Sequence, residues 1–173
     1  MIKKVLGVLV AALLLAGGYG YWSTRGDKSV KGNEAFTRVA VGEVLATFTL
    51  KDQFDKLHTL TDETKKVVFV FKKEPGHVVR SYLNRQKDDY LQSRHTLFVA
   101  DISKMPAMIR EYAAMPDLRE RSYPVLIVYN EALSQKFKGN NDLTKIMVVD
   151  LDRRRVTAIR FASTEKELGR LID

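Results

Sequence analysis

The stretch VFVFKKEPGHVVRSY, residues 68–82, contains the junction of a strand and a helix. Its apolar start extends back to Lys66, and such a continuous apolar run suits a central strand covered on both faces. The charged loop Lys72–His77 follows, with a Pro-Gly pair inside it. Beyond the loop, apolar residues recur at the spacing of one helix face: Val79, Tyr82 and Leu83. This order of strand, loop and helix decides the fold class.

Strands and helices alternate along the rest of the chain. Strand patterns lie at 45–51, 57–60, 66–71, 95–102, 124–130, 145–151 and 156–161. Helical patterns lie after the loop at 72–77, around 105–115, at 131–136 and from Thr164, where Glu167 completes a capping box. We therefore predict an α/β fold with a mixed sheet, helices on both faces and an N-terminal β-hairpin extension.

The N-terminal region predicts export. Lys3 and Lys4 precede the apolar run 5–16, as in a secretory signal. Residues 1–22 are either a cleaved signal peptide or a retained apolar anchor helix, and the sequence does not decide between them. Residues 23–39 are a predicted linker, and residues 40–173 a predicted single domain. The protein is thus expected in the periplasm, or anchored in the inner membrane and facing the periplasm.

Composition limits the chemistry of the chain. Among 173 residues there is no cysteine, so acylation as a lipoprotein is excluded, as is any thiol reaction. The net charge of +8 favours weak attraction to anionic surfaces, but we expect no nucleic-acid partner. The three histidines, His58, His77 and His95, lack metal-ligand spacing, so no metal site is expected. We also expect no cofactor, since no Gly-rich dinucleotide motif follows a strand.

The order of elements and several local patterns resemble the thioredoxin-like superfamily. The stretch VGEVLATFTLKDQFDKLHTLTDETKKVVFVF, residues 41–71, is similar to the N-terminal β extension and first core strand of peroxiredoxins and membrane-anchored periplasmic thioredoxins. Tyr123-Pro124 resembles the family's cis-proline before its third core strand. The segments 145–161 and 163–172 resemble the closing hairpin and helix. The likeness covers residues 40–173.

This sequence departs from the family where the family's reactive cysteines belong. That position falls at or near Lys72–Val78, which contains none. Disulfide exchange and peroxide reduction both require a thiolate, so neither activity is expected. The chain more closely resembles Cys-less periplasmic thioredoxin-like proteins. The resemblance implies a binding or scaffolding role toward an envelope protein or peptide, without electron transfer.

Three groups of residues are candidate binding sites. The first is the loop after the central strand, with Lys72, Lys73, Glu74, Gly76 and His77. Ligands bind at the carboxyl ends of strands in open α/β sheets, so an alternative function is small-anion binding or non-thiol catalysis there. The second is the face of Tyr123 and Pro124, which the resemblance implies for extended polypeptide. The third is a basic hairpin tip formed by Arg153, Arg154 and Arg155, for anionic lipid or an acidic partner.

Two further patterns have structural interpretations. The apolar stripe from Met105 to Met115 has helical spacing and is interpreted as core filler. Asp101 ends a predicted strand, and its carboxylate is interpreted as a cap for the next helix.

Overall fold

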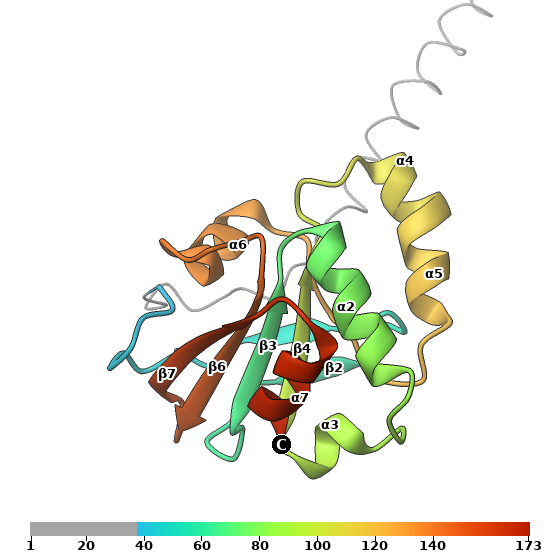
Figure 1. Cartoon of the computed structure of the whole chain (residues 1–173). Helices are drawn as coiled ribbons and strands as arrows, with labels where there is room; N and C mark the ends of the chain where they lie inside the picture. Colours follow the sequence, from blue (N-terminus) through green and yellow to red (C-terminus); the bar gives the residue numbers. More distant parts are fainter. Residues whose placement is uncertain (1–37) are drawn as a thin grey trace, which may run out of the picture.

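The computed structural model describes residues 38–173, and five strands form its main sheet (Figure 1). The strands are β3 (Lys66–Val70), β4 (Thr96–Asp101), β5 (Leu126–Val128), β6 (Ile146–Asp152) and β7 (Arg155–Ala162). Their order across the sheet is β5-β4-β3-β6-β7. β3, β4 and β5 are parallel, whereas β6 and β7 form an antiparallel hairpin beside β3. The predicted mixed sheet is confirmed.

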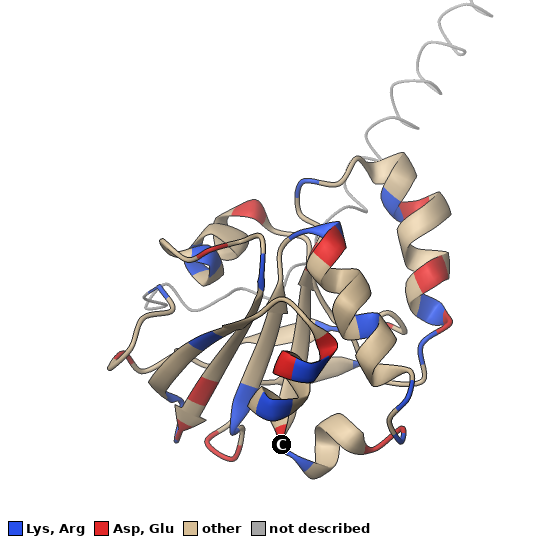
Figure 2. Ribbon diagram, in the orientation of Figure 1, with Lys and Arg blue, Asp and Glu red and all other residues tan. Residues whose placement is uncertain are grey.

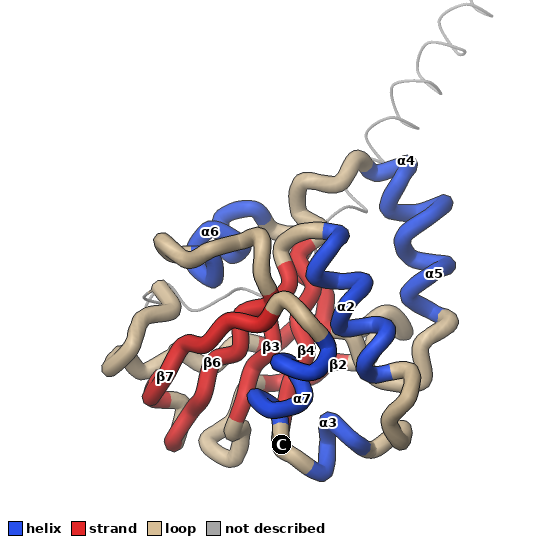
Figure 3. The backbone as a smooth tube through the Cα atoms, viewed as in Figure 1, coloured by secondary structure: helices blue, strands red, loops and turns tan. Residues whose placement is uncertain are grey.

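Helices flank this sheet (Figure 3). They are α2 (Lys73–Leu83), α3 (Tyr90–Ser93), α4 (Ala107–Ile109), η1 (Arg110–Ala114), α5 (Met115–Arg119), α6 (Glu131–Lys138) and α7 (Glu165–Ile172). α2, α3 and α7 contribute to one apolar cluster, and α6 contributes Phe137 to the other. The mixed α/β architecture with helices on both faces therefore matches the prediction.

The central strand β3 is buried on both faces. Val67 and Phe69 belong to the cluster that contains Phe137, whereas Val68 and Val70 belong to the cluster beneath α2 and α7. Alternate side chains of a strand point to opposite faces, so the continuous apolar run is the consequence of two covered faces.

A second, two-stranded sheet precedes the main sheet in the chain. β1 (Thr49–Lys51) pairs antiparallel with β2 (Leu57–Thr59). The preceding residues Leu45 and Phe48 are buried in the Phe137 cluster. Val39, at the end of the predicted linker, is also buried.

The predicted signal peptide or anchor helix lies outside the described residues. The same holds for residues 23–37 of the predicted linker. Among residues 38–173, the structure contains no helix that is both long and apolar enough to cross a bilayer.

The closing hairpin turns through two residues in the left-handed region, Arg153 with φ of 44° and Arg154 with φ of 64°. A two-residue turn with both φ values positive is usually built from Asn-Gly, so arginine there is strained. Side-chain contacts offset this backbone strain. Arg154 Nη1 donates to Thr47 Oγ1 at 3.1 Å, and Arg154 Nε pairs with Asp62. Arg155 Nη1 donates to the carbonyl of Gly42 at 2.7 Å. Two of the three arginines of the predicted tip thus hold the hairpin against the N-terminal segment.

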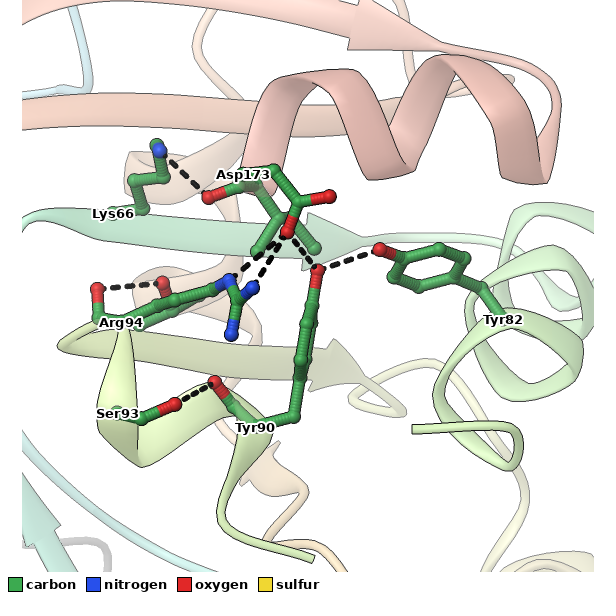
Figure 4. A network of polar contacts seen from close by, with 8 residues as sticks. Lys66, Tyr82, Tyr90, Ser93, Arg94 and Asp173 are labelled. Atoms are coloured by element: carbon green, nitrogen blue, oxygen red, sulfur yellow. Dashed lines mark hydrogen bonds and ion pairs between the residues drawn. The ribbon is translucent and has the colours of Figure 1, made fainter. Parts of the chain in front are cut away.

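The last helix is fixed at both ends. At its start, the predicted capping box of Thr164 and Glu167 is present. At its end, Asp173 Oδ1 accepts from the Tyr90 hydroxyl at 2.8 Å and from Arg94 Nε at 3.0 Å (Figure 4). The Tyr90 hydroxyl also bonds to that of Tyr82, which joins α2 to the same network. Burial, with these bonds, raises the pKa of Tyr90, so its hydroxyl stays protonated.

Candidate functional site

A cavity of about 730 Å³ opens at the carboxyl ends of β3 and β4. One wall is the start of α2, and the opposite wall is the helical segment 107–119, formed by α4, η1 and α5 (Figures 1 and 3). Apolar side chains of the strands, such as Val70 and Phe98, form its floor. The site therefore lies at the carboxyl ends of the central strands, where open α/β sheets bind their ligands.

The segment that was predicted to be a loop lines this cavity, but most of it belongs to helix α2. Lys72 is the N-cap and α2 begins at Lys73, so the Pro-Gly pair lies in the first turns of the helix. Proline is tolerated there because the first N–H groups of a helix have no intrahelical partner. Four of the five predicted residues line the cavity: Lys72, Lys73, Gly76 and His77. Glu74 is exposed and does not line it.

The peptide bond before Pro124 is trans, as are all others in residues 38–173. The resemblance at Tyr123-Pro124 therefore does not extend to a cis peptide bond. Pro124 precedes β5, which is the edge strand of the sheet, and an edge strand tolerates a residue without an N–H. Tyr123 nonetheless lines the same cavity as Lys72, so the structure brings these two predicted groups together.

A buried ion pair forms one side of the cavity. Lys138 Nζ lies 2.7 Å from Asp101 Oδ2, and both side chains are less than 10% exposed. Asp101 Oδ2 also accepts from Ser134 Oγ at 2.7 Å, and Oδ1 accepts from the N–H of Ser103 at 2.9 Å. Burial would raise the pKa of Asp101, but the hydrogen bonds from Lys138, Ser103 and Ser134 outweigh it and hold the pKa below its usual value. The Ser103 contact lies in the turn after β4 and is not a helix cap, because the N-cap of α4 is Pro106 and receives no side-chain hydrogen bond, so the cap prediction was wrong. The ion pair with Lys138 was not predicted.

A second charged cluster lies at the end of the segment 107–119. Asp117 Oδ1 is 3.0 Å from Arg80 Nη1, and Asp117 Oδ2 pairs with Nη2 of Arg121. The Arg121 side chain is only 5% exposed, whereas Asp117 and Arg80 are partly open to solvent. One carboxylate thus faces two guanidinium groups, which leaves this part of the cavity positively charged.

Basic residues outnumber acidic residues around the cavity. Figure 2 shows a blue segment where β3 leads into α2, and both blue and red segments along residues 107–119. The basic side chains that line it are those of Lys72, Lys73, Arg80, Lys104, Arg121 and Lys138. Only Asp101 and Asp117 oppose them among the lining residues that the structure describes. Positive potential in a cavity with low-dielectric walls favours an anionic ligand.

The stripe interpreted as core filler is largely outside the core. Met108, Ile109 and Tyr112 are 73%, 53% and 75% exposed. The inner side of this helical segment lines the cavity through Ile109, Ala113 and Ala114, and only Leu118, beyond the stripe, also packs against the apolar cluster beneath α2. In addition, η1 is a π-helical turn, which shifts the register of the stripe. The core prediction was therefore wrong.

The basic tip lies at the other end of the sheet from the cavity. β6 runs antiparallel to β3, and its Asp150 pairs with Lys66 at the start of β3. The turn that follows β6 therefore lies near the amino end of β3, whereas the cavity lies at the carboxyl end. The tip and the cavity cannot form one site.

The cavity has the features of a binding site and lacks those of a thiol enzyme. The chain has no cysteine, so neither a disulfide nor a sulfenic acid can form. Within residues 38–173, no cluster of His, Asp and Glu has the arrangement of a metal site. The cavity is therefore described by its apolar floor and its charged walls.

Comparison with known proteins identifies the fold. No protein-family model and no curated protein matches this sequence. Among solved structures, the chain is similar to a peroxidoxin, BcpB, from Mycobacterium tuberculosis, with 19% identity and a TM-score of 0.52 over 78% of this chain and 95% of that one. It is also similar to a structure from Chlorobium tepidum assigned as thiol:disulfide interchange protein DsbE, with 15% identity and a TM-score of 0.53 over 78% and 96%. The chain therefore has the thioredoxin-like fold, in a form without cysteine.

Proposed function

We propose that this protein is a redox-inactive thioredoxin-like binding domain that holds a polypeptide segment in the cavity between α2 and residues 107–119. The observation that carries this proposal is the cavity itself, an open space of about 730 Å³ at the carboxyl ends of the central strands. Its size is within the range of about 300–1,000 Å³ that is usual for ligand sites. The absence of cysteine excludes thiol-based electron transfer.

A polypeptide fits the surroundings of the cavity better than a small anion does. The floor is apolar, and Ile109 carries the apolar surface from the cavity onto the exposed side chains of Met108 and Tyr112. An inorganic anion would leave this apolar surface unused. Exposed apolar side chains next to a cavity are typical of a surface that binds a partner. Small-anion binding at Lys72 and Lys73 is the alternative function.

Filling the cavity tests this proposal. A Cβ atom at Gly76 would have open space around it, so Gly76→Trp can place an indole beside the cavity without clashing with the backbone. The control is Ser81→Trp, on the same helix but outside the cavity. We expect a random octapeptide library to enrich binders on the full-length chain and on Ser81→Trp. On Gly76→Trp we expect enrichment to fall at least tenfold.

Equal enrichment on the two tryptophan variants would place peptide binding elsewhere and overturn the proposal. If the library enriched nothing on the full-length chain, while inorganic phosphate bound and was lost in Gly76→Trp, the alternative function would replace it.

We also propose that the domain is exported, either free in the periplasm or anchored in the inner membrane. The support is the basic and apolar pattern of residues 1–22. Protease added to intact spheroplasts should degrade the domain, while a cytoplasmic marker survives. Resistance of the domain until the cells are lysed would refute export.

A further inference from the structure

The guanidinium of Arg121 has more hydrogen-bonding capacity than the protein uses. Arginine carries five N–H donors in a planar fork. Within residues 38–173, the hydrogen bond from the Arg121 guanidinium goes to Asp117 alone. The side chain is 5% exposed and lines the cavity. A buried guanidinium with spare donors at a cavity wall is suited to an oxygen-rich ligand.

The hydroxyl of Tyr123 is a second unused donor in the same corner. Tyr123 is 4% exposed and lines the cavity. Within the described part of the chain, the side-chain hydrogen bond that involves Tyr123 goes to its carbonyl, from Gln53, and none involves its hydroxyl. Burial raises the pKa of this hydroxyl, while the charges of Arg121 and Arg80 oppose the shift. The group therefore remains protonated and can donate.

Charge balance indicates what these donors would bind. Arg80 and Arg121 share Asp117, so the corner keeps about one surplus positive charge before any ligand arrives. Lys72 and Lys73, on the opposite wall, have no ion pair within residues 38–173. A ligand with one negative group would neutralise the corner, and the planar fork of arginine matches a carboxylate in particular.

We infer that the corner formed by Arg121 and Tyr123 binds a carboxylate of the bound polypeptide, so that the cavity selects acidic segments with an adjoining apolar side chain. This inference rests on the proposed function. Arg121 supplies the paired N–H donors and Tyr123 supplies the O–H. The apolar neighbour of the acidic residue packs on the floor near Phe98 and Ile102. The carboxylate comes from an Asp or Glu side chain, or from the end of a chain.

The test compares three octapeptide libraries on the full-length chain. The first contains Asp and Glu and is capped at both ends. In the second, Asn and Gln replace the acids, and the third is the second library with a free carboxyl end. We expect at least tenfold greater enrichment from the first or third library than from the second. Enrichment from the first library alone would identify a side-chain carboxylate. Enrichment from the third library alone would identify a terminal carboxylate.

Two substitutions then locate the carboxylate. Arg121→Gln and Tyr123→Phe should each weaken the selected peptide at least fivefold and leave its Asn or Gln counterpart unchanged. Arg85→Gln, which changes charge equally on an exposed residue outside the cavity, should have no effect. The Tyr123→Phe variant keeps the ring, so it tests the site even where Arg121→Gln folds poorly.

Each contrary outcome has its own meaning. Equal enrichment from all three libraries would overturn the carboxylate inference and leave the proposed function intact. Enrichment from none would overturn the proposed function itself. If acidic peptides were selected but neither substitution weakened them, the carboxylate would bind elsewhere, and the assignment to Arg121 and Tyr123 would be wrong.

Discussion

Replacing Lys138 with methionine should lower the free energy of unfolding by about 3–5 kcal/mol at pH 7, the usual cost of removing one partner from a buried ion pair. The Asp101 carboxylate is 4% exposed and would remain charged without its ammonium partner. Ser134 and the N–H of Ser103 would still donate to it, but neither supplies a positive charge. Urea unfolding of the two proteins at pH 7 measures the difference.

The double variant Lys138→Met with Asp101→Asn is the control, and it should recover most of the loss. A neutral amide can accept from the Ser103 N–H through its oxygen and donate to Ser134 Oγ from its NH2 group, and it carries no buried charge. If the double variant were as unstable as the single one, the loss would reflect packing of the Lys138 stem, whose ammonium lies 5.6 Å from the centre of the Phe71 ring.

The pH dependence of the same pair has a defined sign. In the native protein the pKa of Asp101 is lowered, so the ion pair contributes stability that is present above the unfolded pKa of about 3.9 and is lost as the pH falls through the folded pKa. Without Lys138, burial dominates and raises that pKa, so lowering the pH stabilises the variant relative to its value at pH 7. The deficit of Lys138→Met should therefore shrink between pH 7 and pH 4. A constant deficit would contradict the ionic explanation.

Patterns that depend on neighbouring residues were predictable from the sequence. The apolar run at 66–71 predicts a strand covered on both faces, and β3 has two covered faces. Thr164 and Glu167 are three residues apart, and this spacing alone is enough to predict the capping box. The hairpin at 145–161 likewise follows from two apolar strands separated by a short charged segment.

Contacts between distant residues were not predictable. Lys138 meets Asp101 only because α6 returns across the sheet end, and nothing near either residue in the sequence indicates the other. The stripe from Met105 to Met115 has core spacing, but spacing does not show whether a helix lies on the sheet or across a cavity from it. Arg121 and Tyr123 are two residues apart, yet their importance depends on Arg80 and Asp117, which the fold brings beside them.

The absence of a thiol from the cavity limits what its charged residues can do. In this chain the start of α2 carries Lys72 and Lys73 in place of a thiol, and both side chains are exposed at the cavity mouth. Cations at that position can attract a ligand but cannot transfer electrons to it. The buried pair of Asp101 with Lys138, and the buried Arg121 with its partly exposed partner Asp117, then set the charge of the walls. This division of roles is consistent with recognition as the function of the cavity.

Replacing Gln53 with leucine should be the other strongly destabilising change. Gln53 is fully buried, and its side-chain amide bonds on both sides of Pro124. Its Nε2 donates to the carbonyl of Tyr123 at 2.9 Å, and its Oε1 accepts from the N–H of Val125 at 2.8 Å. The amide thereby continues the hydrogen-bonding pattern of a neighbouring strand at the sheet edge. Leucine would leave two buried backbone groups unpaired, at about 1–3 kcal/mol each.

Urea unfolding of Gln53→Leu should therefore show a loss of about 2–6 kcal/mol, whereas Gln92→Leu on the exposed surface of α3 should stay within about 0.5 kcal/mol of the unsubstituted protein. Gln53→Glu separates the two bonds. A carboxylate can accept from Val125, but it can donate to the Tyr123 carbonyl only when it is protonated. Burial raises the pKa of this carboxyl above its unfolded value of about 4.3, so the deficit should shrink as the pH falls from 7 toward that value, because a protonated glutamic acid reproduces both bonds of the amide. A deficit that did not change with pH would mean that the shape of the amide matters here, and that its donor to Tyr123 does not.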